Sequence, residues 1–361
     1  MIKKISILST LALASTTVLG TSTKLQSQPT QQTFSNMFVL GDSLSDTGAF
    51  VGASSQLGNN IFGFNLRRKV TFHAPLYQNS FSNGKVAVQV LADHLNIPLK
   101  AGYFYNPWLG RKINEVGNNY AFGGSQITPV SRAVSFNQLR DTLARNARAM
   151  LINGSAIDKQ ADLLIKQHGK LASDALVIKV IGGNELMSIV EADNGNAVES
   201  TNKITQAINV KKETLKKLIA NNASRIVVGN APNLSLTPRY LDNPKKEVAH
   251  RISTDFNRQL DDMLNNLQIK HPNKIRKFDL NQTLKAKIQE FSARGYNVTE
   301  AATKTSYSSF FKTREITPLF LGKANAENIN NYAFFDEIHP TGTLHREMGN
   351  ALYEVVKKPW N

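Results

Sequence analysis

Short runs of apolar residues alternate with longer amphipathic segments along most of the chain. The runs are nearly continuous in hydrophobic residues, which is typical of strands buried on both faces of a parallel sheet. We predict five such strands, at Met37–Gly41, Asn119–Phe122, Ala175–Ile181, Arg225–Gly229 and Lys274–Asp279. The segments between them predict helices at about Lys85–Leu95, Asn137–His168, Thr201–Asn221, Lys245–Lys270 and Asn281–Phe291, with a last helix after Pro340.

This alternation indicates an α/β fold. Parallel strands joined by right-handed crossovers give a three-layer α/β/α sandwich, here with a central, mainly parallel five-stranded sheet. Folds of this kind bind ligands at the carboxyl ends of their strands. Residues that directly follow the predicted strands are therefore the first candidates for a functional site.

Two long stretches, residues 45–84 and 292–335, do not follow this rhythm. Connections of such length are usually lids or binding loops. Both stretches contain aromatic or large apolar residues, which either pack a subsidiary core or contact a ligand: Phe50, Ile61, Phe62, Phe64 and Phe72 in the first, and Tyr307, Phe310, Phe311 and Phe320 in the second.

The N-terminal residues have the order of a secretory signal peptide. Lys3 and Lys4 precede the apolar stretch Ile5–Gly20, and the polar run Thr21–Thr33 follows it. We predict that residues 1–28 are a signal peptide with a flexible lead-in, that residues 29–361 form a single domain, and that the protein is secreted or extracytoplasmic. An uncleaved membrane anchor is the alternative interpretation of the same stretch.

Composition narrows the chemistry. The 361 residues include no cysteine, which excludes disulfides, thiolate nucleophiles and cysteine-held zinc or iron–sulfur centres. The formal net charge of +16 favours polyanionic partners. For a secreted protein an anionic membrane surface is the expected peripheral contact and nucleic acid is not an expected partner. A monomer is the default expectation.

Two segments at opposite ends of the chain combine the side chains of a serine nucleophile and its base. The first strand ends in Gly-Asp-Ser-Leu-Ser-Asp-Thr-Gly, which places Ser43 at a carboxyl end of the sheet. Near the C-terminus, Asp336 and His339 are three residues apart, so one turn can hold the carboxylate against the imidazole Nδ1. Nε2 is then free to take a proton from a serine hydroxyl.

Two further segments offer donors for an oxyanion. Asn-Tyr-Ala-Phe-Gly-Gly-Ser contributes the unshielded backbone N–H of Gly124, and Ile-Gly-Gly-Asn-Glu contributes the side-chain amide of Asn184. With the backbone N–H of Ser43 these donors can form an oxyanion hole. Taken singly, Gly124 and Asn184 are more typical of turns than of an oxyanion hole.

The set of motifs resembles the four sequence blocks of the GDSL, or SGNH, hydrolase family. The resemblance covers about residues 36–356, and Phe-Ser-Asn-Gly-Lys at residues 81–85 is similar to a further family segment. It implies that Ser43 is the nucleophile, His339 the general base and acid, Asp336 its orienting carboxylate, and Ser43 N–H, Gly124 and Asn184 the oxyanion donors. One departure is Glu185, where the family usually has aspartate.

The resemblance implies a secreted serine ester hydrolase acting on lipid esters, as a lipase or lysophospholipase and possibly an acyltransferase, with no cofactor and no metal. A carbohydrate O-acetylesterase is the alternative enzyme. A non-catalytic extracellular binding protein on the same scaffold is the alternative from another class. The chain has no G-x-S-x-G, H-E-x-x-H, Walker A or G-x-G-x-x-G motif, and we expect His345 on a solvated face of the last helix.

Overall fold

The computed structural model describes residues 32–57, 69–105, 113–130, 152–307 and 313–360. Residues 32–361 belong to one compact unit, and the predicted signal peptide lies outside the described residues. The helices that the described residues form are α1 (Ala49–Leu57), α2 (Ala87–Leu95), α4 (Ile157–His168), α5 (Gly183–Ala192), α6 (Ala197–Ala220), α7 (Pro238–Leu241), α8 (Lys246–Lys270), α9 (Leu280–Ala293) and α11 (Gly342–Val356), with short 3-10 helices η1 (Leu234–Leu236) and η3 (Ile329–Asn331).

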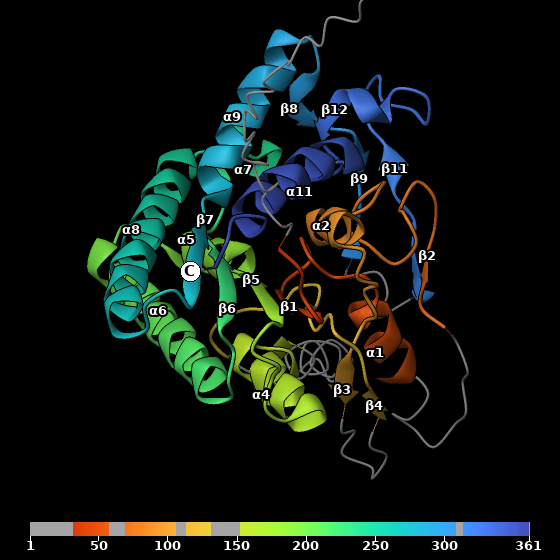
Figure 1. The fold of residues 1–361 in the computed structure, drawn as a ribbon. Coiled ribbons are helices and arrows are strands. Elements are labelled where there is room, and N and C mark those ends of the chain that lie inside the picture. The colour runs from red at the N-terminus through yellow and green to blue at the C-terminus, as the bar shows by residue number, and fades with distance from the viewer. Residues whose placement is uncertain (1–31, 58–68, 106–112, 131–151, 308–312, 361) are drawn as a thin grey trace, which may run out of the picture. The chain divides into compact units, whose positions relative to one another are not determined.

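A four-stranded parallel sheet lies at the centre of the described part of the chain (Figure 1). Its strands are β1 (Met37–Gly41), β5 (Leu176–Val180), β6 (Arg225–Gly229) and β7 (Ile275–Phe278), which pair in this order. The register aligns the carboxyl ends, with Gly41 beside Val180 and Val180 beside Gly229. Segments that follow these strands therefore meet at one edge of the sheet.

One of the five predicted strands, Asn119–Phe122, is not a strand in the structure, and that prediction is wrong. Asn119 makes an isolated parallel bridge to Val39, and the Tyr120 N–H donates to the Val39 carbonyl at 2.8 Å. The pairing ends there because the Gly41 N–H, which would continue the ladder, donates instead to the side-chain oxygen of Gln160 at 2.8 Å. The segment still follows the free edge of β1, since the Phe122 N–H donates to the Gly41 carbonyl at 3.1 Å.

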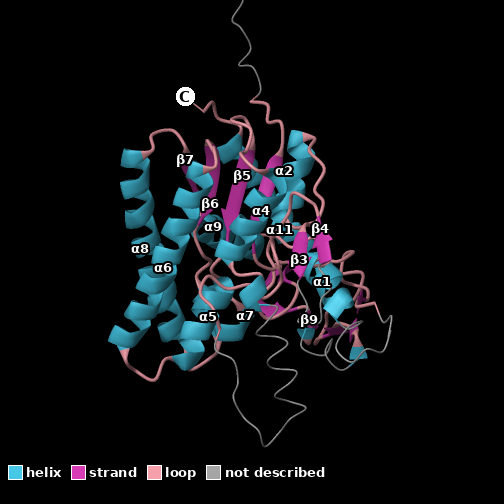
Figure 2. Ribbon diagram, turned by 90° about the horizontal axis from the view of Figure 1, so that it is seen from below, coloured by secondary structure: helices cyan, strands magenta, loops and turns pink. Residues whose placement is uncertain are grey.

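Helices cover both faces of the sheet and give the α/β sandwich its layers (Figures 1 and 2). Phe38 and Leu40 of β1 pack in one apolar cluster with residues of α4, α5, α6 and α8. Met37 and Val39 point the other way and pack with residues of α2, α9 and α11. This alternation along β1 is what a period of two residues requires of a strand buried on both faces.

Helix ends follow local sequence signals where these exist. The Thr341 side chain caps α11 by accepting from the Leu344 N–H, and the Asp279 carboxylate caps α9 through the Gln282 N–H at 2.8 Å. Helix α11 thus begins at Gly342, after Pro340 as predicted. Helices α1, α5 and α7 were not predicted. In α5 the reason is local, because the helix begins within Gly182-Gly183, where glycines lower helix propensity.

The two long stretches contain short elements that pair with one another. In addition to α1, they include β2 (Thr71–Phe72), β8 (Asn297–Ala301), β9 (Thr303–Lys304), β10 (Glu315–Ile316), β11 (Leu319–Phe320) and β12 (Tyr332–Phe334). Strand β10 pairs with β2, β11 with β9 and β12 with β8, while β3 (Tyr103–Tyr105) forms a hairpin with β4 (Ile113–Glu115).

Part of the aromatic content of these stretches forms a third apolar cluster. Phe50 and Phe72 from the first stretch pack there with Phe81, Phe122 and Phe335, and Tyr307 packs against the cluster. Phe320 is 38% exposed. Ile61, Phe62, Phe64, Phe310 and Phe311 lie outside the described residues.

None of the helices formed by the described residues combines the length and the apolar character needed to cross a membrane.

Candidate active site

Ser43 lies in a tight turn directly after β1. A side chain at Gly41 would place its Cβ 2.6 Å from the Val180 carbonyl oxygen, so this position of the strand end requires glycine. The Ser45 and Asp46 N–H groups both donate to the Asp42 carbonyl at 3.0 Å and close the turn. The turn holds Ser43 at the carboxyl edge of the sheet.

Asp46 links this turn to the segment that carries Gly124. Its buried carboxylate accepts the N–H groups of Gly48, Ala49 and Phe50 at the start of α1, and the Gly123 N–H at 2.7 Å. Burial raises the pKa of Asp46 to about 6 despite these four bonds. Since Gly123 directly precedes Gly124, the carboxylate sets where that part of the chain lies relative to the Ser43 turn.

Ser43, His339 and Asp336 form one hydrogen-bonded chain. Ser43 Oγ lies 2.8 Å from His339 Nε2, across 296 positions of sequence. His339 Nδ1 lies 2.8 Å from Asp336 Oδ2 and 2.9 Å from Oδ1. All three side chains are at most 7% exposed. The serine hydroxyl, the imidazole and the carboxylate are thus ordered as in a hydrolytic triad.

The Asp336 carboxylate receives more hydrogen bonds than the histidine alone provides. Its Oδ1 accepts the backbone N–H groups of Ile338 at 3.0 Å and His339 at 2.8 Å, and its Oδ2 accepts the Tyr307 hydroxyl at 2.8 Å. Burial alone would raise the pKa of Asp336, but the charge of His339 and the hydrogen bonds from His339 and Ile338 outweigh burial and hold the pKa below its ordinary value. The carboxylate is therefore kept ionised.

The sequence marks Tyr307 only as one aromatic residue among several and does not predict its contact with Asp336. Burial, followed by the charge of Asp336, holds the pKa of Tyr307 well above its ordinary value, so the phenol remains a donor. Its ring and that of Phe81 flank the His339 imidazole, with ring centroids 5.3 and 5.5 Å from it. The imidazole is thus held by packing as well as by hydrogen bonds.

The three predicted oxyanion donors lie on segments that are tied to one another. The Asn184 side-chain amide donates to the Ser125 carbonyl at 3.1 Å, one residue beyond Gly124. Within the described part of the chain, the N–H groups of Ser43 and Gly124 donate to no protein acceptor. Gly124 has φ +83° and nothing lies within 4 Å of the position its Cβ would take. These N–H groups are available to a ligand.

A small cavity of about 40 Å³ opens beside Ser43, His339 and Asn184. Its wall is almost entirely apolar and comes from the segments that follow β1 and β6, from η1, α5, α9 and α11, and from β12 and the segment after it. The side chains on this wall away from the triad are Met187, Pro232, Leu234, Leu280, Leu284, Phe334, Ile338 and Met348. The site can therefore accept an apolar group next to the serine hydroxyl.

Two fully buried lysines lie behind the site, a feature that the sequence pattern did not reveal. Lys211 of α6 donates to the Ile181 carbonyl at 2.8 Å, directly before the Gly-Gly-Asn segment, and Lys179 of β5 donates to the Lys211 carbonyl at 3.1 Å. Burial lowers the pKa of Lys211 to about 7 and that of Lys179 well below its ordinary value. Burial also raises the pKa of Asp42, next to Ser43.

The expectation for His345 is wrong. This residue of α11 is 1% exposed, and its Nδ1 accepts the Ala87 N–H at 3.2 Å. It faces inward because α11 packs on α2 at this point of the sandwich. Burial lowers its pKa to about 3. Among the residues that the structure describes, no three His, Asp or Glu side chains gather as a metal-ligand set.

Comparison with known proteins assigns the class. The family model of the GDSL-like lipase/acylhydrolases matches residues 37–352. That match spans far more than half of the chain, from β1 into α11, and includes the Ser43, Gly124, Asn184 and Asp336–His339 segments. The chain therefore belongs to the GDSL-like lipase/acylhydrolase family.

Individual relatives are distant and carry several names. The chain is 24% identical to the esterase EstA of Pseudomonas aeruginosa over 358 residues, covering 94% of this chain and 49% of that protein, so it spans about half the length of this relative. It is 23% identical to a GDSL esterase/lipase of Arabidopsis thaliana, covering 87% of this chain and 85% of that one. It is 21% identical to the phosphatidylcholine-sterol acyltransferase of Aeromonas hydrophila, covering 93% and 94%.

Proposed function

We propose that this protein is a carboxylic ester hydrolase in which Ser43 is the nucleophile, His339 the general base and acid, and Asp336 the carboxylate that orients His339. The observation that carries the proposal is the hydrogen-bonded chain from Ser43 Oγ through the imidazole to the Asp336 carboxylate, with 2.8 Å on each side of the ring. A serine hydroxyl is a weak nucleophile without an adjacent base, and His339 Nε2 is placed to be that base.

The reaction proceeds through an acyl-enzyme. Ser43 Oγ bonds to the carbonyl carbon while its proton passes to His339 Nε2, and the carbonyl oxygen becomes an oxyanion. Collapse of this intermediate breaks the ester bond, and the leaving alcohol takes the proton from His339. Water then attacks the acyl-enzyme, again giving its proton to His339, and the acid leaves as Ser43 regains its hydrogen.

The oxyanion of each intermediate is stabilised by the N–H groups of Ser43 and Gly124 and by the Asn184 amide. The two backbone groups have no other acceptor among the described residues, and Asn184 uses one of its two amide hydrogens for Ser125. Donors that are already oriented need no reorganisation during the reaction, and removing one costs about 2.7–4 kcal/mol of transition-state stabilisation.

We infer that the substrate is a lipid ester. The cavity beside Ser43 is lined by aliphatic and aromatic side chains, which suits an acyl chain better than a polar acetylated sugar. The similarity to the phosphatidylcholine-sterol acyltransferase of Aeromonas hydrophila supports a lysophospholipid or phospholipid substrate and transfer to an alcohol as a second outcome. Neither role requires a cofactor.

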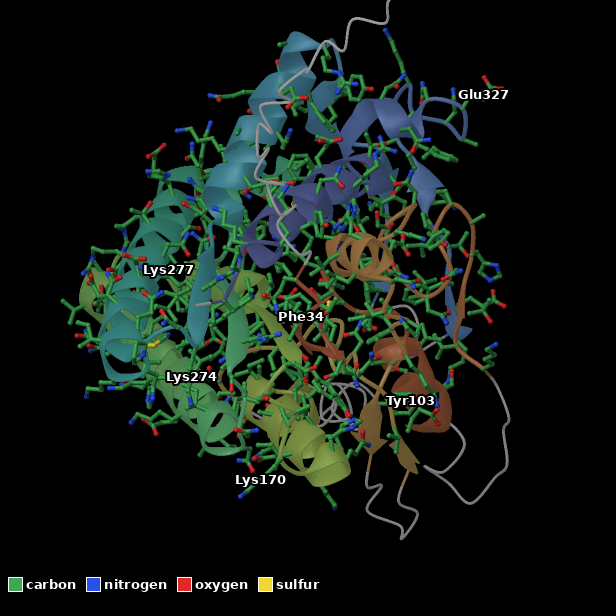
Figure 3. All side chains as sticks on the ribbon, viewed as in Figure 1. Phe34, Tyr103, Lys170, Lys274, Lys277 and Glu327 are labelled. Atoms are coloured by element: carbon green, nitrogen blue, oxygen red, sulfur yellow. The ribbon has the colours of Figure 1, made fainter. Side chains whose placement is uncertain are left out.

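We also propose that the enzyme is secreted, works as a monomer and contacts anionic lipid surfaces. The signal-like order of Lys3, Lys4 and the apolar stretch Ile5–Gly20 supports secretion, and the net charge of +16 supports the lipid contact. In the view of Figure 3, Lys170, Lys274 and Lys277 lie on the side of α4, α6 and α8, away from Glu327. N-terminal sequencing of the exported protein tests secretion, and co-sedimentation with anionic vesicles tests the lipid contact.

The function itself is tested with a panel of p-nitrophenyl esters from acetate to palmitate, together with lysophosphatidylcholine. Ser43→Ala removes the nucleophile, and Ser224→Ala makes the same change on the surface before β6 as a control. We expect hydrolysis that increases toward long chains, falls by about a thousandfold or more in Ser43→Ala, and is unchanged in Ser224→Ala.

The other outcomes are equally informative. Ser43-dependent activity confined to acetate would identify a deacetylating esterase instead. Equal inertness of wild type and Ser43→Ala on every ester would refute the hydrolase and favour a binding protein on this scaffold.

A further inference from the structure

Glu185, the residue that departs from the family's usual aspartate, has its carboxylate fully engaged by the segment that follows Gly124. One carboxylate oxygen accepts the N–H groups of Ile127 at 2.9 Å and Thr128 at 3.0 Å. The other accepts the Thr128 hydroxyl at 2.6 Å. The side chain is 4% exposed. These are three charge-assisted hydrogen bonds within a buried environment, where they are strong and directional.

Asn184 and Glu185, consecutive residues in the first turn of α5, hold consecutive parts of the same segment. Asn184 binds the Ser125 carbonyl, and Glu185 binds the backbone of Ile127 and Thr128. The positions of the Gly124 N–H and the Asn184 amide therefore both depend on the contact between this segment and the start of α5. A shift of the segment relative to α5 would move Gly124 and Asn184 apart.

The segment is restrained on its other sides as well. The Gly123 N–H is held by Asp46 at 2.7 Å, and the Ser125 hydroxyl donates to the Ser155 carbonyl at 2.8 Å. The Gln126 carbonyl accepts the Ile157 N–H at 3.3 Å. Of the run from 123 to 128, only the N–H groups of Gly124 and Gln126 have no acceptor among the described atoms.

The start of α5 is supported from behind by the buried lysine. Lys211 donates to the Ile181 carbonyl, and its charge is attracted by the carboxylates of Glu185 and Asp42. The buried carboxylate of Glu185 is thus satisfied by hydrogen bonds and, when Lys211 is protonated, also by a cation, which is the condition for keeping a carboxylate inside a protein.

We propose that Glu185 is a positioning residue of the oxyanion hole: its carboxylate clamps residues 127–128 to the start of α5 and so fixes the distance between the Gly124 N–H and the Asn184 amide. The inference rests on the proposed hydrolase function and deepens it. The longer glutamate side chain reaches the Thr128 hydroxyl and two backbone N–H groups at once, and a shorter aspartate at this position loses part of that contact.

The test compares an ester with its thionoester, in which sulfur replaces the carbonyl oxygen. Sulfur is a weak hydrogen-bond acceptor, so the thionoester gains little from oxyanion donors, and the ratio of the two rates measures the strength of the oxyanion hole. For Glu185→Gln we expect kcat on the p-nitrophenyl ester to fall about 10- to 100-fold with KM nearly unchanged. The ester-to-thionoester ratio should fall at least about fivefold.

For Glu185→Asp we expect kcat and the ester-to-thionoester ratio to lie between those of wild type and Glu185→Gln. Thr128→Val removes only the hydroxyl donor and should lower kcat on the ester by about three- to tenfold. The ester-to-thionoester ratio should fall by the same factor as kcat. Glu199→Gln makes the same chemical change in the exposed first turn of α6 and should leave all parameters unchanged. Tyr307→Phe, which acts through the triad, should lower ester and thionoester hydrolysis equally.

A folded Glu185→Gln with an unchanged ratio overturns the inference even if kcat falls, because the loss would then not involve the oxyanion. If Glu185→Gln does not fold, an unchanged ratio in Thr128→Val has the same meaning. Absence of Ser43-dependent hydrolysis in the wild type would instead refute the proposed function, and this inference with it.

Discussion

Replacing Tyr307 by phenylalanine removes one oxygen atom and leaves the ring that packs against Phe81 and His339. The lost atom donates to Asp336 Oδ2 at 2.8 Å. A hydrogen bond to a charged group contributes about 1.5–3 kcal/mol. Asp336 keeps its bonds to His339 and two backbone N–H groups, so the lower end applies, and we expect the free energy of unfolding at pH 7 to fall by about 1.5 kcal/mol.

The hydrogen bond from Tyr307 also limits the rotation of the Asp336 carboxylate, and thereby that of the His339 imidazole bound to it. If all of the 1.5 kcal/mol were expressed in the transition state, the rate would fall about 13-fold, so we expect kcat to fall by about 5- to 13-fold with KM unchanged within about twofold. Substrate binding should be little affected because Tyr307 does not line the cavity beside Ser43.

The pH dependence follows from the depressed pKa of Asp336. A carboxylate with a lowered pKa in the folded protein adds stability above its unfolded pKa, and this stability is lost as the pH falls through the folded pKa. Removing the Tyr307 donor raises the pKa of Asp336. The stability difference between wild type and variant is therefore largest at neutral pH and shrinks in acid, and the acid limb of kcat/KM in the variant moves to higher pH.

The assay is urea unfolding and steady-state hydrolysis of a p-nitrophenyl ester at several pH values. Tyr296→Phe is the matched control, since it removes a hydroxyl that accepts from Arg294 on the surface of the same stretch. A Tyr307→Phe protein that is folded and keeps the wild-type kcat and acid limb would refute the reasoning, as would an equal loss in Tyr296→Phe.

Three further predictions concern other buried groups. The lowered pKa of Lys211, about 7 against 10.5 unfolded, means that the unfolded chain binds more protons between these values. From pH 7 to 9.5 the unfolding free energy of wild type should therefore rise by about 3 kcal/mol relative to Lys211→Met, measured by urea titration. The pKa of His345, about 3 against 6.5 unfolded, has a consequence of the same sign in a more acidic pH range. From pH 7.5 to 5 wild type should lose about 2 kcal/mol more than His345→Gln in the same measurement, and equal losses would contradict it. Leu284→Trp fills the apolar cavity and should reduce kcat/KM for the palmitate ester about tenfold or more while acetate changes less than about twofold, whereas a uniform loss would place the acyl chain elsewhere.

Much of the central fold follows from the sequence because it depends on local periodicity. The runs that became β1, β5 and β6 are almost continuously apolar and almost completely buried in the structure. Strand β7 instead has buried Ile275 and Phe278 at its ends and partly buried Arg276 and Lys277 between them. The run at 119–122 has the same pattern as the first three, yet a glutamine 119 positions beyond Gly41 replaces the next ladder bond. A side chain that distant in sequence leaves no sign in the local pattern.

The candidate site likewise has a part that could be predicted from the sequence and a part that could not. Asp336 and His339 are three residues apart, so their contact could be predicted from spacing alone, and Ser43 was placed by the end of β1. Tyr307 precedes Asp336 by 29 residues within a stretch of irregular pattern. Its aromatic character was evident, whereas its hydrogen bond depends on how β9 and β12 lie beside each other, with the Thr303 N–H donating to the Phe335 carbonyl at 2.8 Å.

Glu185 shows how a departure from a motif can be misjudged without the structure. From the sequence alone, Glu185 is only a departure from the family's aspartate, longer by one methylene. In the structure that methylene lets the carboxylate reach two backbone N–H groups and a hydroxyl of the facing segment. Since an unpaired buried carboxylate would be strongly destabilising, these partners and the charge of Lys211 are what make glutamate tolerable at this position. The departure is thus matched by Thr128, and the two residues should be exchanged together if the family's aspartate is to be restored.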